Sequence, residues 1–499
     1  MSSKFGTAAP ERTIGVLSGA AVSISLMIGS GIFSTPSSVL NLVGSPLMVI
    51  VLYVLGGFFS LGGAFSFIEM GIMFPKNGGT LRYLAHSFPK PRLMLSYLFA
   101  WSMIMCIRPG SIAANGPVIS KYLVYAMAGG PDLSTKHPNL YANQGWIYRG
   151  IAVLAISLAT LACMLSVKWS LRLINVLTLM KTTLLLFMGV TGILLLAGAI
   201  KHEKNDNFSR GFKGTKSNLG GYASALNKVF YSYDGWSNIT YSVGEMINPV
   251  KNLPISATLG VGVVTGLYSL SILAYMAAVP ISVALNAKEV LAAEFTNRIF
   301  GPVFGRIILP IFIGLSVFGS ITAQIFSVGR IVSAAADVGY IPWGDKLSKY
   351  SPRFKTPFNA LAFNWVITMI YLLAPPPGDV FDLLVDLVQY PTWIFYGMTA
   401  VGCVYLRYKY PSWELRKYKA FLPITYIFIL VTIYLSVFPF IPYDKSSGTY
   451  PYYLSPVLGI VTLLIGFIPY YYRMYWWANK NDVDLTEWVK EEEQIPIPA

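Results

Sequence analysis

GSGIF at residues 29–33 interrupts the first long apolar segment of this chain, and YSYDGW at residues 231–236 interrupts the sixth. A helix that unwinds inside a bilayer leaves backbone N–H and C=O groups unpaired, which costs several kcal/mol for each group that nothing polar satisfies. Such breaks persist where they line a cavity and a ligand completes the hydrogen bonding. Paired interruptions at corresponding positions therefore indicate a binding site near the middle of the membrane. The alternative is two glycine-kinked structural helices, since glycine is common in membrane helices.

The composition indicates a protein that crosses the membrane many times. The chain has 499 residues, of which 55% are hydrophobic and 12% are charged, and its mean hydropathy is +0.57. Soluble domains carry about 25% charged residues. Twelve apolar segments have about the length needed to cross a bilayer. These predicted spans are 14–40, 45–74, 94–126, 150–167, 172–200, 221–246, 255–281, 303–336, 358–374, 380–406, 421–441 and 453–477.

The sequence predicts an all-α integral membrane protein with a single membrane domain at residues 14–477. The positions of the two breaks suggest two inverted repeats of five spans each, and each repeat opens with a broken helix. The first repeat covers about 14–200 and the second about 221–406, and two extra helices follow at about 421–477.

The distribution of charge predicts the orientation of the chain. An even number of spans places both ends on one side, and Lys and Arg are more frequent in the segments that then face the cytosol. The tails at 1–13 and 478–499 are therefore predicted to be cytoplasmic. The net charge of +15 would also suit a nucleic-acid-binding protein, but basic loops of a membrane protein face anionic lipid. We expect membrane lipid, and no nucleic acid, as their partner.

The sequence offers no chemistry typical of an enzyme, a metal site or a cofactor. Cys106, Cys163 and Cys403 all fall in apolar spans and are expected to be small buried hydrophobic residues, without a disulfide or metal framework. The three histidines fall in predicted loops, and no motif of a catalytic nucleophile lies in a span. We therefore expect no catalytic residues, no metal and no cofactor.

The two breaks suit opposite charges. The half-helix after the first break has free N–H groups at its N-terminus, so the amides of Ser30, Gly31 and Ile32 can hold an anion. The half-helix that ends near Tyr231 presents unpaired carbonyls, which accept from a cation. Together they suit the carboxylate and ammonium of a free α-amino acid. The candidate substrate-binding residues are Ile28, Gly29, Ser30, Gly31, Ile32, Tyr231, Ser232, Asp234 and Gly235.

Lys181 lies within the apolar run 177–196. A lysine at the centre of a membrane helix costs about 2.5–3.5 kcal/mol on insertion scales, which makes a functional role the default hypothesis. We interpret it as a fixed internal cation that donates to carbonyls freed in the first break. The alternative is that its side chain reaches the cytosolic interface, because Arg172 lies only about two and a half turns earlier.

Other charged residues in the spans receive structural interpretations. Asp234 is either a protonatable carboxylate or, as we prefer, a cap for the half-helix that follows. Glu69 is expected to pair with a loop cation, and Arg108 to bind carbonyls released by Pro109. Lys228 is expected to reach the outer interface.

Two features are assigned to the outer loops. NFS at residues 207–209 matches the N-glycosylation sequon, so this loop is expected to be able to carry a glycan. Residues 286–299 are too polar to span and predict a surface helix between the seventh and eighth spans.

Several motifs, in order along nearly the whole chain, resemble the L-type amino acid transporters of the amino acid–polyamine–organocation superfamily. The glycine-serine-glycine motif occurs across the superfamily, whereas the pair Arg108-Pro109 is typical of the L-type branch. The short tails and the stretch from Asp379 to Asp386 are closer to the fungal methionine-permease subgroup. The motifs are IGSGIF at 28–33, Glu69 with Gly71, KNGG at 76–79, IRP at 107–109, Lys181, YDGW at 233–236, Glu245 with NP at 248–249 and NLP at 252–254, and FGS at 318–320 with Arg330.

The resemblance implies a leucine-transporter-type fold of twelve transmembrane helices, with a 5+5 inverted repeat, broken helices 1 and 6, and alternating access. Tyr231 occupies the place of an aromatic gate, and Lys181 matches the lysine that stands in for sodium in sodium-independent members. By position, the substrate carboxylate would meet Ser30 and Gly31. The substrate ammonium would meet the carbonyls of Ile28, Tyr231, Ser232 and Asp234.

The chain also departs from the family pattern. Asp234 stands where glycine is frequent and Ser237 where asparagine is common, which leaves the side-chain selectivity open. The loop at 127–149 has no cysteine, whereas members linked to a heavy chain use one there. No disulfide-linked heavy chain is therefore expected.

These observations together predict a sodium-independent secondary transporter of neutral L-amino acids in the plasma membrane, with methionine as the first candidate substrate. Proton symport is the preferred energetic scheme, and obligatory exchange is the second. The alternative from another class is an amino acid sensor that uses the same fold without flux.

Overall fold

The computed structural model shows a bundle of helices. It describes residue 12 and residues 14–489, apart from 129–142, 201–204, 342–343, 348, 352, 355, 377–379, 412–415 and 443–449. Within these ranges the only strand-like pairing is one bridge between Ile14 and Met246. The all-α class is therefore confirmed for the described part of the chain. Residues 1–11 of the predicted N-terminal tail and residues 490–499 of the predicted C-terminal tail lie outside the described residues.

The first half of the chain contains the first break and the helices that surround it. Its helices are α1 (Val16–Met27), α2 (Gly31–Ser34), α3 (Pro36–Val43), α4 (Pro46–Met73), α5 (Thr80–Ser87), α6 (Met94–Ser102), the π-helical segment η1 (Met103–Ile107), α7 (Arg108–Ala128), α9 (Gln144–Leu165) and α10 (Val167–Leu196).

The second half contains the second break. Its elements are α11 (Asn207–Arg210), α12 (Leu219–Tyr233), the 3-10 segment η2 (Asn238–Glu245), α13 (Pro249–Ala278), α14 (Ile281–Asn286), η3 (Lys288–Val290), α15 (Leu291–Phe300), η4 (Gly301–Ile308), α16 (Leu309–Asp337), α17 (Gly344–Leu347), α18 (Phe358–Leu373), α19 (Val380–Lys409), α20 (Leu422–Val437), η5 (Phe438–Phe440), α21 (Leu454–Tyr471), η6 (Tyr472–Trp477) and α22 (Ala478–Lys480).

Both predicted breaks are present. In the first, α1 ends at Met27 and the N–H of Gly29 turns back to the carbonyl of Met27 at 2.7 Å before α2 begins. In the second, α12 ends at Tyr233, Asp234 is extended, and Gly235 has φ +124°. Only glycine adopts that angle readily, so the residue that breaks the sixth segment is fixed by backbone geometry.

Glycine is also required where the two breaks meet. A Cβ atom on Gly31 would lie 2.4 Å from the Cα of Ser232, and a Cβ on Gly235 would lie 2.8 Å from the carbonyl carbon of Leu26. Side chains at either position would push the two interrupted helices apart. The two glycines thus let segments 200 residues apart in sequence cross in direct contact.

Eight helices in the described part of the chain are long and apolar enough to cross a membrane, so the chain is a multi-pass membrane protein. The other predicted spans correspond to α6 with α7, α12 with η2, α18 and α19. Two of them are too short, because α12 is interrupted after 15 residues and α18 has 16, and α19 is less apolar because its first half carries Asp382, Asp386 and Gln389. The count of twelve stays a prediction.

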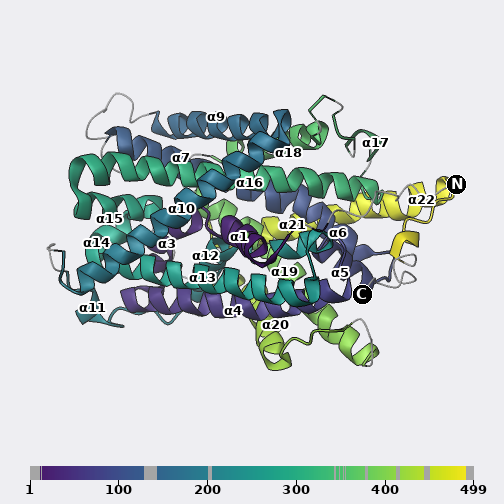
Figure 1. Ribbon diagram of the computed structural model, residues 1–499, viewed down its shortest axis with the longest axis horizontal. Coiled ribbons are helices and arrows are strands. Elements are labelled where there is room, and N and C mark those ends of the chain that lie inside the picture. Colours follow the sequence, from purple (N-terminus) through teal and green to yellow (C-terminus); the bar gives the residue numbers. More distant parts are fainter. Residues whose placement is uncertain are drawn as a thin grey trace.

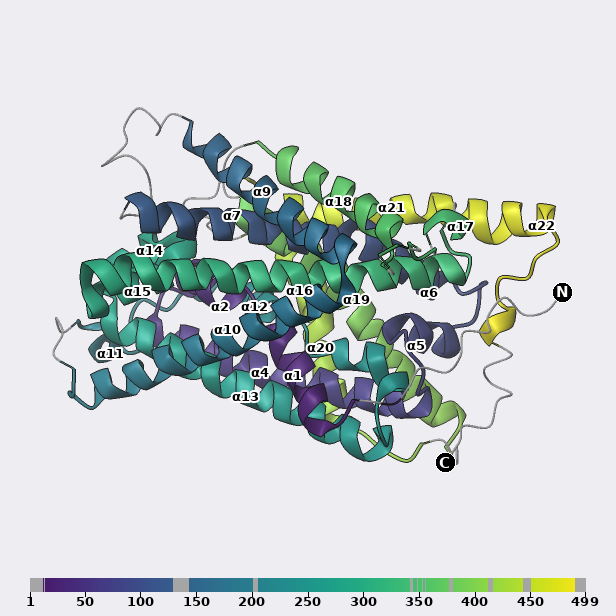
Figure 2. The ribbon, with the colours of Figure 1, turned by 45° about the horizontal axis from the view of Figure 1, so that its top comes forward.

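The short connecting helices separate to the two ends of the bundle. Figures 1 and 2 show α11, α14 and α15 at one end and α5, α17 and α22 at the other, with the long helices α4, α13 and α16 running between them. The broken helix α1 lies near the middle of the bundle (Figure 1). The two ends therefore correspond to the two groups of loops that the sequence places on opposite sides.

Two expectations for the first of these ends are wrong. Asn207 is fully buried, and its side chain donates to the carbonyls of Met276 and Val279 and accepts from the N–H of Ile281. It joins α13 to α14 and is not available for a glycan. The segment at 286–299 is helical as predicted, but α15 buries much of its length, including Phe295, instead of lying on the surface.

Candidate functional site

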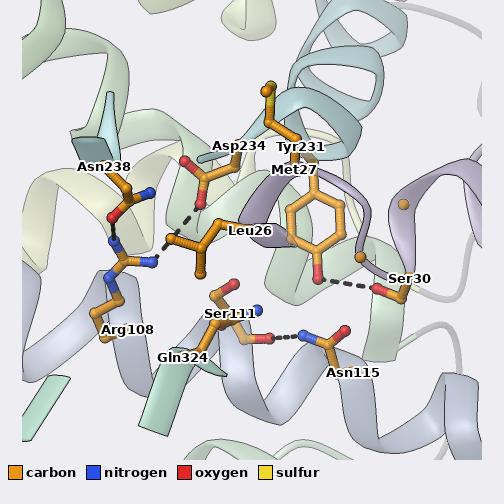
Figure 3. Close-up of a pocket in the computed structure, with 12 residues that line it drawn as sticks. Leu26, Met27, Ser30, Arg108, Ser111, Asn115, Tyr231, Asp234, Asn238 and Gln324 are labelled. Carbon is orange, nitrogen blue, oxygen red and sulfur yellow. Dashed lines mark hydrogen bonds and ion pairs between the residues drawn. The ribbon is translucent and has the colours of Figure 1, made fainter. Parts of the chain in front are cut away.

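A small pocket lies between the two breaks and the helices α7 and α16 (Figure 3). Its position in the fold follows from the contact of the two interrupted helices at Gly31 and Ser232. The residues that line it are Leu26, Met27, Gly29, Ser30, Gly31, Arg108, Ser111, Asn115, Tyr231, Asp234, Asn238 and Gln324.

The first break supplies free donors to this pocket. The N–H groups of Phe33 and Ser34 both bond to the carbonyl of Ser30, so the helical ladder restarts at that residue. In the described chain no protein acceptor is found for the amides of Ser30, Gly31 and Ile32. Three free amides at the start of a half-helix are the donors that the sequence predicts for an anion, and their binding of one stays a prediction.

Carbonyls of both breaks already have partners. The hydroxyl of Tyr268 lies 2.7 Å from the carbonyl of Met27 and 2.8 Å from that of Ser232, so the two breaks share the single proton of one side chain from α13. The carbonyl of Ile28 accepts from the Ser320 hydroxyl at 3.2 Å. A carbonyl has two lone pairs, so each retains capacity for a further donor.

Lys181 lies where the sequence predicts an internal cation. Its side chain is 1% exposed, so the alternative that it reaches the interface is wrong. Its ammonium donates to the carbonyl of Ser25, in the last turn before the first break, and to the hydroxyl of Ser320 at 3.4 Å. Lys181 thus ties α10 to α1 and α16 beside the break.

Arg108 faces the pocket, contrary to expectation. Its guanidinium donates to Oδ1 of Asn238 at 3.0 Å and lies 3.9 Å from the carboxylate of Asp234 (Figure 3). The carbonyls released by Pro109 do not hold it. Asp234 is likewise not the helix cap that we preferred. The residue that directly precedes η2 is Ser237, and no side-chain hydrogen bond caps the start of this helix. The two opposite charges form a loose ion pair on the pocket wall.

Three polar atoms of this wall are buried without a protein partner in the described chain. They are Nε of Arg108, Oδ1 of Asn115 and Oε1 of Gln324. The nitrogen of the Asn115 amide donates to the carbonyl of Ser111 at 2.7 Å (Figure 3), which leaves Oδ1 as the unpaired end of this side chain in the described chain. Buried polar groups are nearly always satisfied in proteins, so these three atoms are places on the pocket wall where water or a polar ligand would bond.

Sequence reasoning missed Ser111, Asn115, Asn238 and Gln324 as site residues. A signal was present for the first two, because residues 108, 111 and 115 follow the spacing of one helix face inside an apolar span. Gln324 is the single amide side chain of α16, and Asn238 follows the second break. No local sequence pattern marks either residue as part of a site.

Of the predicted substrate-binding residues, the structure brings one subset to the pocket. Ile28, Ile32, Ser232 and Gly235 lie beside it in the two breaks but do not line it. The hydroxyl of Tyr231 lies 3.5 Å from that of Ser30 (Figure 3). The ring of Tyr231 packs edge-on against Phe381 of α19 at 5.9 Å. Those that line the pocket are Gly29, Ser30, Gly31, Tyr231 and Asp234.

Two further charged clusters lie outside the pocket. The carboxylate of Glu69 is fully buried and pairs with Arg407 at the end of α19, at 2.9 Å, and with Arg416 in the segment after it, at 3.1 Å. The predicted pairing of Glu69 is confirmed. Lys228 does not reach the interface as predicted, because its ammonium pairs with Asp382 at 2.8 Å and with Asp386 at 3.4 Å.

Comparison with known proteins identifies the family. The family described as "Amino acid permease" matches residues 14–465. The chain belongs to the amino acid permease family. Its relatives include the "High-affinity methionine permease" of Saccharomyces cerevisiae, 28% identical over 468 residues, which cover 92% of this chain and 79% of the relative.

Two animal transporters match over a similar length. The "b(0,+)-type amino acid transporter 1" of Mus musculus is 31% identical over 488 residues, 97% of this chain and 93% of the relative. The "Cystine/glutamate transporter" of Homo sapiens is 29% identical over 479 residues, 94% of this chain and 86% of the relative. The resemblance to L-type amino acid transporters is thus confirmed, and the relatives of this permease are transporters, not enzymes.

Proposed function

We propose that this permease is a sodium-independent secondary transporter of neutral L-amino acids, with methionine as the first candidate substrate. It works by alternating access of two inverted five-span repeats in a twelve-span fold. The observation that carries the proposal is the pocket between two broken helices, where free amides of one break face the other break.

The pocket geometry supports recognition of the amino acid backbone. The amides of Ser30 and Gly31, which line the pocket, and that of Ile32 beside them bind the substrate carboxylate, which replaces the missing acceptors. The carbonyls of Tyr231 and Asp234, which line the pocket, and those of Ile28 and Ser232 beside them bind the substrate ammonium. These groups contact only the carboxylate and the ammonium, which all α-amino acids share. We therefore assign selection of the substrate side chain to α7 and α16.

The charges on the pocket wall favour a neutral substrate. Asp234 alone would favour a basic side chain, but the guanidinium of Arg108 lies 3.9 Å from it and offsets its charge. The side chains of Arg108 and Asp234 are 5% and 24% exposed, so the carboxylate is the more accessible member of the pair. A substrate without net side-chain charge leaves this pair intact, which is the reason for placing methionine before arginine and glutamate.

Lys181 supports independence from sodium. Its ammonium occupies the space beside the first break where an inorganic cation would bind the same carbonyl of Ser25 and hydroxyl of Ser320. A fixed cation makes sodium unnecessary at that place. Proton symport then supplies the driving force, and obligatory exchange is the competing scheme.

The remaining assignments concern the setting of the protein. We place it in the plasma membrane with both termini in the cytosol, and with the end that carries α11, α14 and α15 facing outward. It functions without a disulfide-linked heavy chain, because its three cysteines are all buried and free. Membrane lipid and the amino acid are its partners.

Uptake into proteoliposomes tests the proposal. The purified chain should accumulate labelled L-methionine, and leucine should compete, whereas methionine methyl ester should compete at least about tenfold more weakly because it lacks the carboxylate. Gly31→Ala should abolish uptake, since its Cβ would lie 2.4 Å from the Cα of Ser232. Gly262→Ala is the matched control, because nothing lies within 4 Å of the added atom.

The outcomes separate the alternatives. Uptake only into vesicles preloaded with amino acid would indicate exchange, and uptake that follows an imposed proton gradient would indicate symport. Binding of methionine without flux in either experiment would indicate a sensor and contradict the transporter. Competition by the ester equal to that of the free acid would contradict the assignment of the amides.

A further inference from the structure

A cluster of one buried and two partly buried charges, with the carboxylates of Asp382 and Asp386 22% and 14% exposed, joins three helices next to the pocket without lining it. Lys228 of α12, whose side chain is 4% exposed, pairs with Asp382 at 2.8 Å and Asp386 at 3.4 Å, both on α19. The hydroxyl of Ser38, on α3, lies 3.3 Å from both carboxylate oxygens of Asp382. The cluster therefore holds together the half-helices α3 and α12, which belong to the two broken helices, and α19.

The cluster lies beside the residue proposed as the gate. Lys228 precedes Tyr231 by about one helical turn on α12. Asp382 follows Phe381, whose ring packs edge-on against that of Tyr231 at 5.9 Å. Both carboxylates project from one face of α19, because residues four apart share a face. Separating α12 from α19 would thus break the aromatic contact and the ion pairs together.

We propose that Lys228, Asp382 and Asp386 form a charge latch that keeps the pocket closed toward the end of the bundle that carries α11, α14 and α15. Under the function proposed above, this end is extracellular, and the latch opens when the protein takes up substrate from outside. Lys228 is a positioning residue, because it acts through the two acids and does not touch the substrate.

The physics of buried charge gives the latch two stable positions. A buried ammonium without a partner carries a large desolvation cost, so Lys228 stays in the protein interior only while the carboxylates are close. Once α19 moves away, water must enter and solvate all three groups. A half-open state has neither the ion pairs nor the water, so the cluster favours a fully closed or a fully open entrance.

Accessibility of the pocket from outside tests the latch without requiring transport. Ser111 lines the pocket on α7 and is 4% exposed, so Ser111→Cys reports entry of a charged, membrane-impermeant thiol reagent applied to intact cells. The same proteins without the added cysteine give the background, because the native cysteines are buried. Lys228→Met in this reporter should raise the labelling rate at least about tenfold.

The control variant removes an ion pair that lies at the same end of the bundle but is not part of the latch. Arg210 and Asp206 pair at 2.6 Å on the surface, with side chains 48% and 59% exposed. Arg210→Met should leave labelling at the wild-type rate. The double exchange Lys228→Asp with Asp382→Lys restores opposite charges and should return labelling toward wild type.

Each outcome decides for or against the latch. Equal labelling of Lys228→Met and wild type, with both at the cell surface, would overturn it, as would faster labelling that the charge exchange does not reverse. Faster labelling only from the cytosolic side would contradict the assigned direction. If Lys228→Met does not reach the surface, Asp382→Asn replaces it with the same expected increase. A wild type that takes up no amino acid but shows these changes would contradict the proposed function and leave the latch supported.

Discussion

Lys181 and Lys228 are two lysines buried in the same bundle, 1% and 3% exposed, in surroundings of different chemistry. Lys181 donates to a backbone carbonyl and a hydroxyl, and no carboxylate in the described chain pairs with it. Lys228 lies between two carboxylates. A lysine among neutral oxygens acts as a bound cation that stabilises a broken helix, whereas a lysine among acids joins helices that can separate.

The largest effect is expected from removing the first lysine. Lys181→Ala leaves the carbonyl of Ser25 buried without its donor, an unsatisfied group worth about 1–3 kcal/mol, so uptake should fall about tenfold to a hundredfold. The variant should still reach the membrane, since its spans are intact. Uptake of labelled methionine, normalised to surface protein, measures this. Normal transport by Lys181→Ala would remove its assigned role.

Replacement by arginine sharpens the comparison. Arginine suits carboxylates, so Lys228→Arg should keep uptake within about threefold of wild type. Lys181→Arg forces a larger planar group into a site of backbone and hydroxyl oxygens, and overpacking of about 1–3 kcal/mol should reduce uptake about tenfold or more. Parallel uptake assays on both variants test the difference. Equal tolerance of arginine at the two positions would mean that their surroundings do not distinguish their roles.

Arg108 is a third buried cation, and its expected effect is on selectivity. Arg108→Gln leaves the carboxylate of Asp234 without its counter-charge, so arginine should compete about tenfold better for methionine uptake. Asp234→Asn leaves the opposite charge and should favour glutamate by a similar factor. Competition curves for arginine, leucine and glutamate on each variant measure the shift. Unchanged curves for both variants would show that the pair does not contact the side chain of the substrate.

The smallest effect is expected at an exposed cation. Arg210 pairs with Asp206 on the surface, where solvent screens the interaction and side-chain ordering opposes it. Arg210→Met should change neither uptake nor melting temperature measurably. A loss of uptake comparable to that of Lys181→Ala would show that removal of a positive charge acts nonspecifically.

The same comparison explains what the sequence can predict. The broken helices were predictable because two glycine-centred runs lie at corresponding places in the two halves of the chain, whereas either run alone would also fit a kinked structural helix. The internal position of Lys181 was predictable because its partner Ser25 lies in the last turn before a break that the sequence already marks, and its role stays a proposal. The partners of Lys228 lie 154 and 158 residues away on α19, and hydropathy near residue 228 carries no information about them.

Arg108 and Asn207 are two further residues whose partners in other segments the sequence did not predict. Proline beside Arg108 suggested a local partner, but the guanidinium donates to Asn238, 130 residues away. The sequon at Asn207 suggested exposure, but its amide joins the end of α13 to the start of α14. A local motif therefore predicts a local geometry well, whereas partners in other helices depend on packing that one sequence does not display.

Uptake by the wild-type chain with and without sodium tests the central claim most directly. Proteoliposomes holding only the purified chain are given labelled L-methionine in sodium buffer and in choline buffer of equal ionic strength, at the same pH. If Lys181 serves as the cation beside the first break, the initial rates should agree within the error of the measurement. A rate that falls to background in choline would contradict the account, because the site beside Ser25 would then need an ion that Lys181 does not replace.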